Sequence, residues 1–88
     1  MAKKGNHTII GVHVSERVKR VKQVQQILTA HGCQIKTRLG LHDAGEDNCS
    51  PNGLLLLEVI GPAREAAALM KELREVEGVD VKKMVFPH

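Results

Sequence analysis

The chain has 88 residues, a length that fits one small domain and leaves no room for a second. Its composition is 42% hydrophobic and 26% charged, which is typical of a globular protein and excludes a disordered or collagen-like chain. Phe86 is the only aromatic residue, so sites built from stacked rings, such as base-stacking sheet platforms and cation–π cages, are excluded as well.

Charge is distributed unevenly along the chain, although its net value is only +3. Residues 1–40 contain eight Lys and Arg against the single acid Glu16, whereas residues 41–88 contain five against nine. The opposite net charges of the two halves favour either a basic surface for nucleic acid or two copies that pack basic half against acidic half. Without interleaved aromatic residues, direct contact with nucleic acid is the minor alternative.

The termini and the cysteines indicate a cytoplasmic protein. Cys33 and Cys49 are too few for the dense disulfide pairing of small secreted domains. The lysines near the start precede no apolar stretch of a signal peptide, and the longest apolar run, Leu54–Leu57, is far shorter than the roughly 20 residues of a membrane span. We expect residues 1–6 to form a disordered tail and residues 7–88 to form the domain.

The first half of the chain predicts a strand, a helix and a second strand. Residues 7–14, HTIIGVHV, are β-branched and apolar, and Ser15 then supplies an oxygen that caps a helix. Gly32 is expected to end this helix in the left-handed conformation. Residues 33–41 alternate, with Cys33, Ile35, Thr37, Leu39 and Leu41 on one face. The helix is expected to bury one stripe, which consists of Val18, Val21, Val24 and Leu28.

The second half repeats this order after a polar loop at residues 42–53. Residues 54–60 are apolar on both faces except for Glu58, which predicts a central strand. Gly61 and Pro62 open a helix that Gly78 closes, and residues 79–86 form the last strand. The buried stripe of this helix is expected to contain Ala66, Leu69, Met70, Leu73 and Val76.

The resulting βαββαβ order predicts the α+β, ferredoxin-like sandwich, in which two helices cover one face of a four-stranded antiparallel sheet. The first and third strands are then central, and the other face of the sheet is open. On the first strand this open side carries His7, Ile9, Gly11 and His13. Such an apolar surface is too large for a monomer, so we expect a homodimer or homotetramer that associates through the sheet face or its edge.

Four segments carry a resemblance to a known family: TIIGVHV, IKTRLGLH, LLLLEVIG and GVDVKKM. Over residues 7–86 the chain resembles the regulators of the iron-only hydrogenase system, which are free-standing ACT-like domains. They are related in fold to the C-terminal domain of the nickel-responsive repressor. The resemblance implies an oligomeric sensing domain, a transcriptional regulator without its own DNA-reading helix.

Metal binding is one candidate function that the same resemblance raises. The nickel-sensing relatives bind metal through a His-x-His pair on the second strand, where this chain has Arg38 and Gly40. Arginine has no lone pair to donate, so both strand ligands are missing. His42 and Cys49 in the loop, with His13 on the first strand, remain as an alternative metal site. Their other interpretation is a surface imidazole and a loop thiol, and we expect Ni²⁺ or Zn²⁺ to bind weakly or not at all.

Anion binding is the other candidate. Arg38 and Lys36 are expected to project from the same face of the second strand, and a guanidinium on a rigid strand suits a carboxylate or phosphate. His13 or the loop is expected to complete the pocket. Alternatively, both cations only keep an edge strand from pairing with other chains.

Catalysis is not expected, because the chain has no glycine-rich phosphate loop, no Cys-x-x-Cys and no nucleophile and base close in sequence. No cofactor is predicted. The leading hypothesis is a non-enzymatic oligomeric regulatory domain that binds an unidentified small molecule, with an anion as the candidate, at a subunit interface. The alternatives are a nickel-type metal sensor and an assembly domain without a ligand.

Overall fold

The computed structural model describes residues 7–15, 17–41 and 53–87. The expected tail at residues 1–6 and most of the expected loop, residues 42–52, lie outside this range. Four strands, two α-helices and one short 3₁₀ turn follow one another along the described chain. They are β1 (His7–Val14), α1 (Arg17–Ala30), η1 (Gly32–Gln34), β2 (Ile35–Leu41), β3 (Gly53–Val59), α2 (Ala63–Arg74) and β4 (Val79–Phe86).

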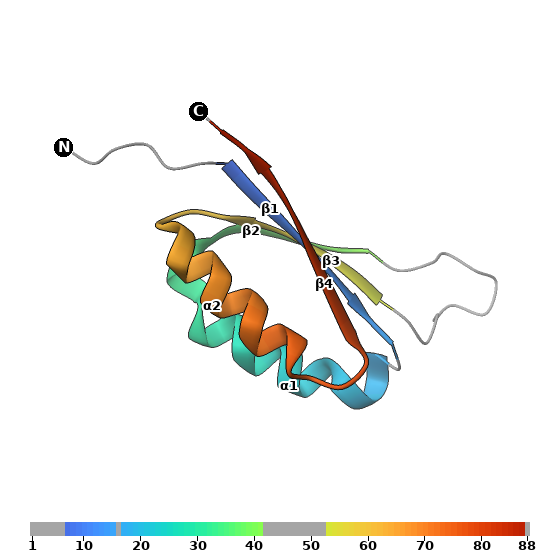
Figure 1. The fold of residues 1–88 in the computed structure, drawn as a ribbon. Helices are drawn as coiled ribbons and strands as arrows, with labels where there is room; N and C mark the ends of the chain where they lie inside the picture. The colour runs from blue at the N-terminus through green and yellow to red at the C-terminus, as the bar shows by residue number, and fades with distance from the viewer. Residues whose placement is uncertain (1–6, 16, 42–52, 88) are drawn as a thin grey trace.

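The four strands form one antiparallel sheet in the order β2-β3-β1-β4. β1 and β3 are central, and β2 and β4 are the edges. Figure 1 shows both helices side by side on the same side of this sheet. The βαββαβ order, the antiparallel pairing and the single helix layer confirm the predicted ferredoxin-like fold.

The core lies between the helices and one face of the sheet. Alternate residues of the central strands are buried there, because successive side chains of a strand point to opposite faces. The predicted stripe of the second helix is buried at all five positions; four of them pack in this core from α2, and Val76 follows the end of the helix. The residues with no measurable exposure are Ile10, Val12, Leu57, Leu69 and Leu73.

Among the residues of α1 whose burial is described, one position of the predicted stripe departs from expectation. Val24 and Leu28 are buried in the core, whereas Val21 is 39% exposed. Helical spacing gives the direction of a side chain but does not determine whether another element covers it. Near its C-terminal end, α1 contacts α2 through a hydrogen bond between His31 Nε2 and Glu72 Oε2, 3.0 Å apart.

The two glycines predicted to end the helices behave differently. Gly78 has a φ of +83°, the left-handed conformation that was expected, and its carbonyl accepts a hydrogen bond of 2.8 Å from the Ser15 amide. Gly32 has no positive φ and begins the 3₁₀ turn η1, so the prediction of a left-handed stop there was wrong. Pro62 precedes α2 as its capping residue rather than occupying its first turn.

Strand β2 also differs from its prediction. It begins at Ile35, because Cys33 belongs to η1, and its register with β3 shifts between Ile35 and Thr37. This irregularity inserts an extra residue and breaks the expected alternation. Ile35 is opposite Val59 on the helix side, whereas Thr37 and Leu39 are opposite residues of the open face.

Candidate functional site

Arg38 lies on the helix side of the sheet, at its β2 edge. In the register it is opposite Leu57, whose side chain is buried in the core, and its Nη2 donates a hydrogen bond of 2.8 Å to Oε1 of Gln25 on α1. Arg38 itself is exposed. Among the described residues no carboxylate pairs with it, and the uncharged amide of Gln25 is its one hydrogen-bond partner.

Lys36 lies at the irregularity of β2 and is exposed. Its charge acts on Glu58 of β3, whose carboxylate is on the open face. The expectation that Lys36 and Arg38 project from one face assumed strict alternation, which the register shift interrupts. The structure therefore gives these two cations different surroundings, one near Glu58 and one against α1.

His13 is exposed on the open face, where the register places it between Leu54 of β3 and Asp80 of β4. Since Arg38 lies on the helix side, the sheet separates the two side chains. A pocket that combines both residues within one chain is not formed. His42 and Cys49, the alternative metal ligands, lie outside the described residues.

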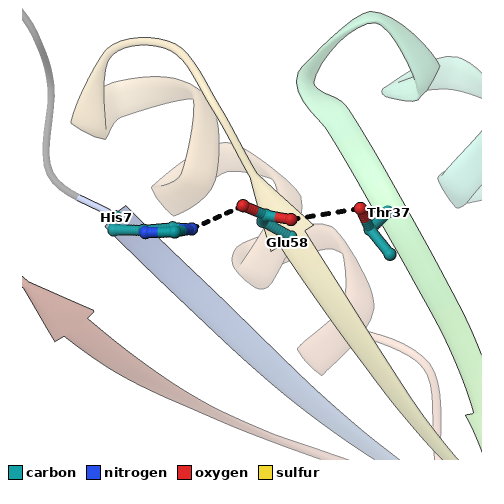
Figure 2. A network of polar contacts seen from close by, with 3 residues as sticks. All are labelled: His7, Thr37 and Glu58. Atoms are coloured by element: carbon teal, nitrogen blue, oxygen red, sulfur yellow. Dashed lines mark hydrogen bonds and ion pairs between the residues drawn. The ribbon is translucent and has the colours of Figure 1, made fainter.

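A polar network on the open face was not predicted from the sequence. Figure 2 shows the Glu58 carboxylate between His7 of β1 and Thr37 of β2. Oε2 of Glu58 lies 2.5 Å from Nε2 of His7, and its Oε1 accepts a hydrogen bond of 3.1 Å from the Thr37 hydroxyl. Three strands thus contribute to the network, and both oxygens of the carboxylate have a partner.

These contacts change the acidity of Glu58. The hydrogen bond with His7 lowers the pKa of this carboxyl most, and the bond from Thr37 lowers it further. Partial burial raises the pKa, whereas the charges of Lys36 and His7 lower it, and the net shift is downward. The network therefore favours the ionised carboxylate.

One signal in the sequence pointed to this network. Glu58 is the single charged residue in the apolar run of β3, and a lone carboxylate in a central strand usually has a partner. Its partners could not be found from sequence, because they depend on the register of β3 with two other strands. Thr37 in particular is opposite Glu58 only because of the shift in β2.

In the described part of the chain, no group of three or more His, Cys, Asp or Glu residues is arranged to hold a metal ion. Neither α1 nor α2 is long and apolar enough to cross a membrane.

Comparison with known proteins identifies the fold but no family. No family model and no curated protein sequence matches the chain. An uncharacterized protein from Thermotoga maritima is similar in structure, with a TM-score of 0.78 and 22% identity over 93% of this chain and 98% of that one. A nitrogen regulatory PII-like protein from Thiomonas intermedia has a TM-score of 0.59 and 12% identity, covering 98% of both chains.

The fold also occurs within an enzyme. A formyltetrahydrofolate deformylase from Pseudomonas putida matches 89% of this chain with 28% of its own length, at a TM-score of 0.56 and 16% identity. The TM-scores, not these low identities, show that this chain shares a ferredoxin-like, ACT-type fold with these three proteins. The likeness to regulators of the iron-only hydrogenase system stays a prediction.

Proposed function

We propose that this protein is a non-enzymatic regulatory domain that associates with copies of itself and binds a small anion beside Arg38. The observation that carries the proposal is the exposure of Arg38 together with its uncharged hydrogen-bond partner. Its guanidinium is exposed on a sheet edge, and its one described hydrogen-bond partner is the uncharged amide of Gln25. A permanent cation positioned in this way is suited to a carboxylate or phosphate.

The hydrogen bond to Gln25 supports a binding role over that of an edge guard. A lysine or arginine that only prevents strand pairing needs no fixed orientation. Arg38 is instead oriented by a side chain of α1 across a distance of 2.8 Å, which reduces the entropy lost when an anion binds. His13 of the same chain does not contribute to this site, since the sheet separates it from Arg38.

The relatives in fold are consistent with this kind of ligand. The PII-like protein from Thiomonas intermedia was solved bound to ADP, AMP and bicarbonate, all of which are anions. The resemblance of this chain to hydrogenase-system regulators adds the role of a transcriptional regulator. We propose that role together with anion binding.

Calorimetric titration of the full chain with ADP, AMP, bicarbonate and inorganic phosphate tests the proposal. We expect at least one of these anions to bind, and Arg38→Leu to weaken that binding about ten- to a hundredfold, the value of one charge-assisted hydrogen bond. Lys22→Leu is the matched control, because it removes an exposed charge from α1 and should change affinity less than about twofold.

Two results would contradict the proposal. One is that none of the four anions binds the native chain at millimolar concentration. The other is equal binding by the native chain and Arg38→Leu, which would leave Arg38 as an edge guard and make an assembly domain without a ligand the better description.

A further inference from the structure

The open face of the sheet combines exposed apolar side chains with the Glu58 network. We infer that a second copy of this chain docks on this face, open face against open face, around Gly11 at its centre. The inference rests on the self-association included in the proposed function and specifies its surface. The exposed apolar residues of the open face are Leu39 (51%), Leu54 (37%), Met84 (53%) and Phe86 (52%), with Ile9 and Leu56 half-buried between them.

Gly11 is the first observation that points to a close partner. It occupies the middle of the central strand β1, where glycine weakens a strand and commonly marks the approach of another backbone. Packing within the chain does not require it, because a Cβ at this position would come no closer than 3.9 Å to Leu56 or Lys82. Gly11 therefore leaves room on the open face for a Cβ, and for the close approach of a second chain.

The distribution of charge identifies the occupant. The open face carries the carboxylates of Glu58 and Asp80 on either side of its centre, and the ammonium group of Lys82, which is opposite Gly11. A membrane surface or nucleic acid would select a uniformly basic face. A face that carries both signs complements itself when two copies are related by a twofold axis.

The area of the face is sufficient for a modest dimer. Four strands about 4.8 Å apart, each rising about 3.3 Å per residue over seven or eight residues, give a plane of roughly 450 Å² per copy. Two copies then bury roughly 900 Å², below the roughly 1,200 Å² at the low end of stable specific interfaces, which is the size of a weak association. We therefore expect dissociation on the order of micromolar concentration.

The Glu58 network explains how a carboxylate can be enclosed in such an interface. An ionised group without partners strongly opposes burial. Here the oxygens of Glu58 already contact His7 Nε2 and the Thr37 hydroxyl within the same chain. These contacts replace much of the hydration that the carboxylate would lose when a partner covers it. The open face is thus prepared for contact with another apolar surface.

Sedimentation velocity on the full chain between 1 and 100 µM tests the inference through two pairs of variants. Met84→Asp places a charge on the open face, whereas Val85→Asp places it on the next residue of β4, which the register directs to the helix side. We expect Met84→Asp to weaken self-association at least tenfold and Val85→Asp to change it less than about twofold. Both positions are exposed, at 53% and 38%, so both variants should fold, as circular dichroism will verify.

The second pair is Gly11→Ala and Gly40→Ala. A Cβ meets only ordinary contacts at either position, the nearest at 3.9 Å and 3.5 Å, so neither change should disturb a single chain. We expect only Gly11→Ala to weaken self-association, about threefold or more, because Gly40 is on the helix side of β2.

The outcomes separate this inference from the proposed function. Equal effects of Met84→Asp and Val85→Asp would place the interface at the β4 edge, and a dimer insensitive to Met84→Asp and Gly11→Ala would place it elsewhere. Either result overturns the inference while self-association and anion binding stand. A native chain that remains monomeric at 100 µM overturns the inference and the proposed assembly together, and calorimetry with Arg38→Leu still decides anion binding.

Discussion

The two faces of the sheet contain similar residues but have different surroundings. β3 includes four consecutive leucines, of which Leu57 is fully buried and Leu55 packs at the margin of the core. Leu54 and Leu56 point the other way, and Leu54 is 37% exposed. Identical side chains in one strand thus belong to a core and to an open surface. The position of the helix layer, rather than hydrophobicity, decides between these environments.

The polar groups of the two faces differ as well. The helix-covered face has no buried polar or charged side chain among the described residues, whereas the open face includes the Glu58 network in its apolar surroundings. A core that forms during folding can exclude charges altogether. A surface that becomes an interface is exposed to water before assembly. A carboxylate with partners in its own chain is stable both in the exposed surface and in the assembled interface.

The largest expected effect comes from truncating leucines on the two faces. Leu57→Ala should lower the free energy of unfolding by about 2–5 kcal/mol, because it leaves a cavity in a fully buried site. Leu54→Ala should cost less than about 1 kcal/mol at concentrations where the chain is a monomer. Urea unfolding followed by far-ultraviolet circular dichroism measures both, since the chain contains no Trp or Tyr. Equal losses would show that the open face is as well packed as the core.

The sequence predicted the fold through signals that depend on local period. The β-branched, apolar run at residues 7–14 and the segment at residues 79–86 after Gly78 predicted β1 and β4 with their observed bounds, and helical spacing identified the buried stripe of α2. The sequence did not reveal the register shift between Ile35 and Thr37, because an extra residue in an edge strand has no signature in the residue types of that strand. That shift decides which face each residue of β2 occupies.

The candidate site was predictable only as a set of residue types. Arg38 and Lys36 were identified as exposed cations on the second strand, and both are exposed. Their expected combination with His13 required knowledge of the sheet face, which the shift in β2 had altered. The Glu58 network, formed by residues 21 and 51 positions away from Glu58, depends on strand register that no local pattern encodes.

The second prediction concerns the turn that connects the helix layer to β4. Gly78→Ala should lower the free energy of unfolding by about 1–2 kcal/mol, because its φ of +83° is costly for a residue with a Cβ. The added Cβ would also lie 3.4 Å from the Ser15 carbonyl oxygen. Urea unfolding of the monomer measures the loss.

Gly32→Ala is the matched control for this turn. Gly32 has no positive φ, and nothing lies within 4 Å of a Cβ at that position. Its replacement should change stability by less than about 0.5 kcal/mol, or increase it slightly by restricting the unfolded chain. If Gly32→Ala were as costly as Gly78→Ala, the assignment of the two turns to different conformations would be wrong.

The smallest expected effect is the contribution of Glu58 to stability in acid. Because the folded chain lowers the pKa of this carboxyl, the unfolded chain binds the proton more readily. The contribution is therefore complete above the pKa of the unfolded state and is lost as pH falls through the lower folded pKa. In Glu58→Gln this contribution is missing at every pH. The urea midpoints of native chain and variant should differ most near neutral pH and converge in acid.

Glu75→Gln provides the comparison that assigns this effect to the network rather than to charge alone. Glu75 is exposed on α2 and pairs only loosely with Lys71, at 3.9 Å, an arrangement that contributes little to stability. Its removal should leave the acid dependence of the native chain unchanged. The urea midpoints of the native chain and Glu58→Gln are compared at concentrations where the chain is a monomer. If their difference stayed constant with pH, the Glu58 carboxylate would be no better stabilised in the fold than in water. The open face would then present an ordinary charge to its partner, and enclosing it would cost the full desolvation of a carboxylate.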